Sequence, residues 1–64
     1  MTMTEARKIR ARGIAQEATA TELMNYLTMY TPYHNKFECT NDTELEYNEI
    51  YQIIKEEIAK RLQA

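Results

Sequence analysis

The chain has 64 residues, a net charge of −2 and only one glycine, one proline and one cysteine. At this length it forms at most one domain, near the size where a single core gives only about 3–5 kcal/mol and self-association often helps. Its apolar runs are far shorter than the roughly 20 residues that span a bilayer, so we expect no membrane contact.

The compartment is predicted from the cysteine count and the start of the chain. Cys39 has no second cysteine with which to form a disulfide within the chain. The first ten residues, MTMTEARKIR, are charged where a secretory signal needs an apolar core. We therefore expect a reducing, cytoplasmic setting.

Charge is unevenly distributed along the chain. Residues 1–16 carry four cations and one acid, a charge of +3, whereas residues 17–64 carry nine acids and four bases, a charge of −5. The chain is therefore a dipole along its length.

The first half is predicted to form one long helix over residues 4–30. One series of positions keeps an unbroken heptad spacing across it. These positions are Ala6, Ile9, Gly13, Gln16, Ala20, Leu23, Leu27 and Tyr30. A glycine inside a helix costs about 1 kcal/mol relative to alanine, so we expect another helix to pack closely on Gly13.

A break in this helix near residues 19–21 is the competing interpretation. Thr19 and Glu22 have the spacing of a capping box, in which each side chain accepts a hydrogen bond from the other residue's backbone N–H. A break there gives three helices instead of two.

Residues 31–42 are predicted to form an aromatic loop, because Pro32 disfavours the helical conformation of the residue before it. The five tyrosines and one phenylalanine all lie between Tyr26 and Tyr51, and we expect them to meet at this end of the molecule. We expect them to close the core as an aromatic plug. The alternative, functional interpretation is a recognition surface that includes Tyr30, Tyr33 and His34.

The last helix is predicted over residues 43–62, capped by Asn41 or Thr43. Its apolar positions recur at three- and four-residue spacing, and its acids lie on the opposite face, where we expect solvent. Glu57 and Arg61 are four residues apart and support the helix by only about 0.2–0.5 kcal/mol. The apolar positions are Tyr47, Ile50, Tyr51, Ile54, Ile58 and Leu62.

These elements predict an all-α fold in a single domain over residues 1–64. Two helices folded back on each other leave half of each apolar stripe exposed. We therefore expect a helical hairpin or small three-helix bundle, with a homodimer that resembles a four-helix bundle preferred over a compact three-helix monomer.

The clearest indication of function in the sequence is the basic run, which consists of Arg7, Lys8, Arg10 and Arg12. At about 100° per residue these cations cover more than half of a helix circumference, so at least two lie away from any packed face. Such a surface binds acidic proteins or nucleic-acid phosphates. We expect a protein partner with an acidic surface, since the run lacks the second recognition element of the usual DNA-binding motifs.

His34 and Cys39 are the residues that invite a catalytic or metal-site interpretation. One histidine and one cysteine fall short of the four ligands of a zinc site, and nothing in the sequence indicates the orienting group of a nucleophilic pair. We expect no enzyme activity, no metal and no cofactor.

The sequence thus favours a small non-enzymatic interaction protein, an inhibitor, adaptor or regulator that occupies a partner's surface. Its predicted contacts are the basic run together with Tyr30, Tyr33 and His34. The alternative is a small nucleic-acid-binding regulator that contacts phosphates through the basic first helix. Chains of this size and style are common among phage- and plasmid-encoded regulators, but no motif indicates a family.

Overall fold

The computed structural model describes residues 4–63, and residues 1–3 and 64 of the predicted domain lie outside the described residues. The described chain is all-α and contains no strand, which confirms the predicted fold class. Its elements are α1 (Glu5–Glu17), α2 (Ala20–Tyr30), the 3-10 turns η1 (Thr31–Tyr33) and η2 (Lys36–Glu38), and α3 (Asp42–Gln63).

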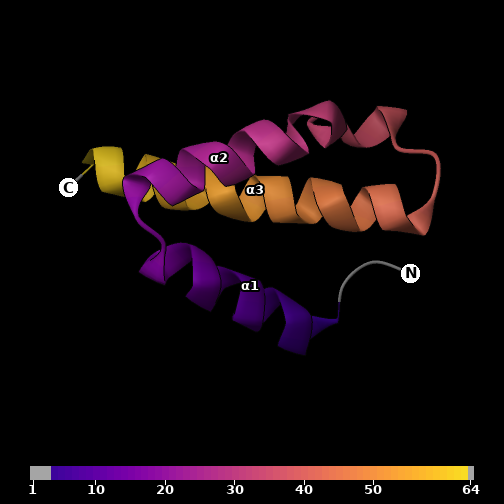
Figure 1. Cartoon of the computed structure of the whole chain (residues 1–64). Helices are drawn as coiled ribbons and strands as arrows, with labels where there is room; N and C mark the ends of the chain where they lie inside the picture. The colour runs from indigo at the N-terminus through magenta and orange to yellow at the C-terminus, as the bar shows by residue number, and fades with distance from the viewer. Residues whose placement is uncertain (1–3, 64) are drawn as a thin grey trace.

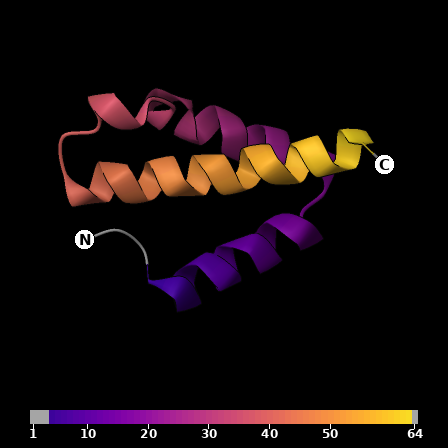
Figure 2. The same ribbon diagram turned by 180° about the vertical axis from the view of Figure 1, so that it is seen from behind.

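The longest helix, α3, is the central element of the fold. α2 runs alongside α3 in the opposite direction, whereas α1 is inclined to α3 (Figure 1). The same arrangement is visible from behind (Figure 2). α1 and α2 each pack on α3 and make little contact with each other. The small three-helix form is therefore observed, and homodimerisation stays a prediction.

The single helix predicted over residues 4–30 is wrong, because the chain breaks at Ala18 and Thr19. Both residues are extended, with ψ of 146° and 163°. The capping box is present: Thr19 Oγ1 accepts from the Glu22 N–H at 3.1 Å, and the Glu22 carboxylate accepts from the Thr19 N–H at 2.9 Å. Such a cap stabilises a helix start by about 1 kcal/mol, and the turn allows Ala15 and Ala18 to be buried against α3.

The close approach predicted at Gly13 is not found within the described chain. A Cβ at this position would meet no atom within 4 Å. The break separates the two halves of the heptad series, so α1 packs with a different face. That face consists of small residues, with Ala11, Ala15 and Ala18 against the core.

The core lies where α1 and α2 meet α3. Leu23 is 1% exposed, and Ile53 and Ile54 are buried beside it. The predicted stripe on α3 is correct for Ile54, but it omitted Ile53 and included Leu62, which is 81% exposed. The buried surface of α3 is wider than one stripe because two helices pack on it.

Arg61 links the end of α3 to the end of α1. Its Nη2 donates to the carbonyl oxygens of Ala15, Gln16 and Ala18 at 3.2, 3.2 and 2.6 Å. Its Nε donates to Glu57 at 3.2 Å, which is the contact expected from the sequence. The residue predicted only to support its own helix therefore also holds α1 in place.

Candidate functional site

The predicted cations are distributed over two sides of α1. Arg7 is exposed, and its Nη1 lies 3.2 Å from Oε2 of Glu46 on α3. Lys8 and Arg12 lie on the other side and line a polar hollow. Arg10 is exposed and forms no ion pair with the residues the structure describes. The run is therefore not one continuous binding surface.

The sequence predicted that the acidic face of α3 points to solvent, but part of this face is covered. Arg7 of α1 covers part of it, and the side chain of Glu46 is only 23% exposed. Glu49 is half-buried beside the polar hollow. An acidic surface thus meets the basic run within the same chain, at the contact between α1 and α3.

The polar hollow between α1, α3 and η2 has a volume of about 330 Å³. Its cations are Lys8, Arg12 and Lys36, and its acids are Glu49 and Glu56. Because two acids lie among its three cations, the hollow has no strongly positive potential.

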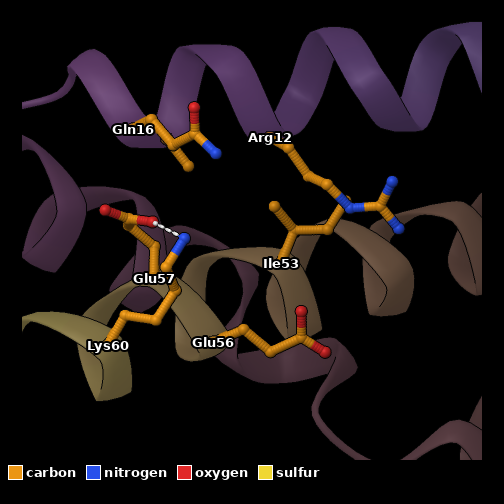
Figure 3. A pocket seen from close by; sticks show the side chains of 7 residues that line it. Arg12, Gln16, Ile53, Glu56, Glu57 and Lys60 are labelled. Atoms are coloured by element: carbon orange, nitrogen blue, oxygen red, sulfur yellow. Dashed lines mark ion pairs between the residues drawn. The ribbon is translucent and has the colours of Figure 1, made fainter. Parts of the chain in front are cut away.

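A smaller cleft of about 60 Å³ lies between α1 and α3. Figure 3 shows Arg12 and Gln16 reaching from α1 toward Ile53 on α3, with the ion-paired Glu57 and Lys60 beyond them. One water occupies about 30 Å³ in the liquid, so this cleft has room for little more than solvent.

On another side of the bundle, an apolar groove lies between α1 and α2 and has a volume of about 280 Å³. Its lining is apolar apart from the tyrosine hydroxyls. It consists of Ala11, Ile14 and Ala15 on α1, Tyr26 and Tyr30 on α2, and Ile50, Ile53 and Ile54 on α3. The groove exists because α1 and α2 pack on α3 without closing against each other.

The predicted aromatic plug forms in part. The rings of Tyr33 and Tyr30 lie 4.9 and 5.6 Å from that of Tyr47, centroid to centroid. Asn48, which the sequence did not single out, is buried beside them and donates to the Tyr33 carbonyl at 2.7 Å. Of the predicted contact residues, Tyr30 also lines the apolar groove. Tyr33 packs on Tyr47 at the closed end of the hairpin.

Phe37 does not join the plug, because its side chain is 96% exposed. It is carried on η2, where the Asn35 side chain accepts from the Phe37 N–H at 3.0 Å. Cys39 is half-buried, and its Sγ donates to the carbonyls of Asn35 and Glu44. An exposed aromatic on such an ordered turn is a candidate contact that our sequence reasoning missed. The turn-forming Asn35 two residues earlier was the available signal.

His34 is exposed at the same corner. Its Nδ1–H donates to the Thr31 carbonyl at 2.9 Å. Its ring packs edge-on against that of Tyr51, with the ring centroids 6.5 Å apart. Within residues 4–63, no three His, Cys, Asp or Glu side chains are placed to hold a metal ion. No helix in the described range has the length and hydropathy to cross a bilayer.

Two carboxylates have lowered pKa values, and both act at helix starts. The hydrogen bond from the Thr19 N–H, and then that with the Thr19 hydroxyl, lowers the pKa of Glu22. The Thr40 hydroxyl, and then the Thr40 N–H, lowers the pKa of Glu44. A general acid at neutral pH needs the opposite shift, so these groups are structural caps.

Comparison with known proteins does not change this description. No protein-family model matches the chain, and neither a curated protein nor a solved structure matches it.

Proposed function

We propose that the chain is a non-enzymatic protein-interaction module, an inhibitor, adaptor or regulator that acts by covering a partner's surface. The apolar groove carries this proposal. A chain of 64 residues has little apolar surface to spare, yet three helices leave a hollow of about 280 Å³ open between them. Open apolar surface of this kind is typical of binding sites.

Two further features of the molecule support a protein as the partner. Arg7 and Arg10 precede the groove residues Ala11 and Ile14 by four positions, so cations border the groove on the α1 side. Phe37 adds an exposed aromatic of the type that anchors protein interfaces. A cytoplasmic setting and self-association belong to the proposal on the sequence grounds given above.

A nucleic-acid-binding regulator is the second candidate. The convergence of Lys8, Arg12 and Lys36 on the polar hollow favours it. Glu49 and Glu56 line the same hollow and repel phosphates, which places this function second.

Affinity capture from a lysate of the native cell tests the proposal. The baits are the wild-type chain, Phe37→Ala and Arg10→Glu, with Lys55→Glu as the matched control, because it makes the same charge change at an exposed site outside the groove. We expect a protein that the wild type and Lys55→Glu retain and that Arg10→Glu or Phe37→Ala loses.

Equal capture by all four baits would contradict the proposal. Retention of duplex DNA or RNA in place of protein, with an affinity that falls as salt rises, would favour the second candidate.

A further inference from the structure

We infer that a second copy of the chain packs on one face of the α2–α3 pair, with Met24 of each copy against Leu62 of the other. The inference goes beyond the proposed function, which uses the apolar groove and leaves this face open. It names a surface for the self-association that the sequence predicts. Four properties lead to it: the composition of the face, its paired hydroxyls, its shape and the small core of the chain.

The face is apolar along both helices. It contains a second hollow of about 230 Å³, which shares no residue with the apolar groove. Met24 and Leu62 line this hollow and are 55% and 81% exposed. Further positions of both helices continue the face at three-, four- and seven-residue spacing. We call the whole set the dimer face: Ala20, Met24, Leu27, Thr28 and Thr31 on α2, and Tyr51, Ile58 and Leu62 on α3.

The dimer face and the apolar groove lie on opposite sides of α2. Tyr26 lines the groove, and Met24, two positions earlier, is about 160° away around the helix. In both views α1 lies on one side of the α2–α3 pair (Figure 1 and Figure 2). A copy docked on the dimer face therefore leaves the groove open for a partner.

The threonines of the dimer face already have hydrogen-bond partners. Thr28 Oγ1 donates to the Met24 carbonyl at 3.0 Å, and Thr31 Oγ1 donates to the Leu27 carbonyl at 2.6 Å. A buried hydroxyl without a partner is costly. Because these two are satisfied within α2, a second copy covers their methyl groups without that cost.

Charged residues only border the dimer face. The guanidinium of Arg61 is engaged by the Ala18 carbonyl and by Glu57. Lys55 is exposed three residues before Ile58, and the long stem of a lysine lets its ammonium stay in water. Depletion of charge is typical of the core of a protein interface.

The shape of the dimer face is self-complementary. Met24 and Leu62 line one hollow, so they lie at the same height along the antiparallel pair. A two-fold axis parallel to the helices places α2 of one copy over α3 of the other and brings Met24 against Leu62. All neighbouring helices are then antiparallel, as in a four-helix bundle. Because one patch contains both the protruding side chains and the hollow that receives them, the occupant is a second copy.

The size of the chain's own core also favours a second copy. Leu23 is the one large side chain within residues 4–63 that is fully buried. Chains this small gain stability from disulfides, metals or self-association. The single cysteine excludes a disulfide within the chain, and the described residues contain no group of metal ligands. Self-association is the remaining source.

The area of the dimer face is sufficient for a small stable interface. α2 and α3 are about 16 and 33 Å long at 1.5 Å per residue and about 10 Å wide each, which gives a projected face of about 500 Å². Side chains raise the accessible area above the projection. Two copies together bury about 1,000–1,200 Å², near the lower limit for stable interfaces.

Sedimentation equilibrium of the full chain, from micromolar to millimolar concentration, tests the inference. The wild type is expected to reach twice its mass of 7.6 kDa. Met24→Glu should raise the dissociation constant of the dimer at least about 100-fold, because it buries an unpaired carboxylate against Leu62. Met29→Glu is the matched control, since Met29 is 61% exposed and lies about 140° around α2 from Met24. It should change the constant by less than about threefold.

Mixing two variants tests the contact itself. Met24→Glu and Leu62→Lys are each expected to be monomeric alone, and an equimolar mixture should form a heterodimer. In the mixture the new carboxylate of one chain meets the new ammonium of the other, and the second contact is native. In the wild type, isotope-filtered NMR on mixed labelled and unlabelled copies should show contacts between the Met24 and Leu62 methyl groups.

Three outcomes would overturn the inference. They are a wild type that stays at 7.6 kDa throughout, equal weakening by Met24→Glu and Met29→Glu, and no heterodimer from variants that circular dichroism shows to be folded. A monomeric wild type whose partner capture is lost in Phe37→Ala would refute the inference and leave the proposed function standing. A dimer with equal capture by all four baits would do the reverse.

Discussion

Nη2 of Arg61 lies 2.6 Å from the carbonyl oxygen of Ala18, 43 residues earlier in the chain. The last carbonyls of a helix have no partner within it, and a cation near them is favourable. One guanidinium on α3 therefore satisfies the end of α1. Together with the ion pair between Arg7 and Glu46, this contact fixes the α1 wall of the apolar groove.

Arg61→Ala should lower the free energy of unfolding by about 1–2 kcal/mol, because charge-assisted hydrogen bonds to the α1 carbonyls are lost from a half-buried site. Urea unfolding measures the change. Lys60→Ala is the matched control, since it removes only the 3.7 Å contact of an exposed lysine with Glu57, which keeps its bond to Arg61, and should cost less than about 0.5 kcal/mol. Equal losses for both variants would show that Arg61 does not hold α1.

Gly13→Ala should raise the free energy of unfolding by about 0.5–1 kcal/mol, because alanine has the higher helix propensity and its Cβ meets open space. Thermal or urea unfolding of the variant checks the sign. A destabilised variant would mean that another helix packs on this position, as the heptad series had indicated.

Glu22→Gln should make stability less dependent on acid pH. The pKa of Glu22 in the folded chain is below its ordinary value of 4.5, so its charge stabilises the fold above that pH. This contribution is lost as the pH falls through the lowered pKa. Unfolding midpoints measured from neutral pH down to about pH 3 should fall less steeply in Glu22→Gln than in the wild type. Identical slopes would refute the capping role of this carboxylate.

Phe37→Ala should separate binding from stability. An exposed side chain outside any packed contact changes the free energy of unfolding by less than about 0.5 kcal/mol. Tyr47→Ala, at the centre of the aromatic cluster, should cost about 2–3 kcal/mol. Chemical denaturation of the two variants tests the contrast, and a large loss in Phe37→Ala would place this ring in the core.

The sequence predicted what depends on local pattern. The stripe through Ile50, Ile54 and Ile58 identified α3, and Pro32 together with the clustered tyrosines identified the corner. The spacing of Thr19 and Glu22 also contained the capping box. The heptad series outweighed it in our interpretation, although a regular spacing of small residues carries little burial energy.

Contacts between residues far apart in the chain could not be predicted from local sequence patterns. Nothing local distinguishes an Arg61 that pairs with Glu57 from one that also reaches Ala18. Ile53 lies outside the stripe that faces α2, and its burial depends on where α1 folds back. The apolar groove has the same origin, because no single helix contains it.

The most direct test of this account is the set of NMR contacts between the methyl groups of α1 and α3. If the chain breaks at Thr19, nuclear Overhauser effects are expected between the Ala15 methyl and the methyl groups of Ile53, since both residues are buried in one cluster. Their absence, together with helical amide contacts running unbroken through residues 17–20, would show one long helix, and the apolar groove would not exist.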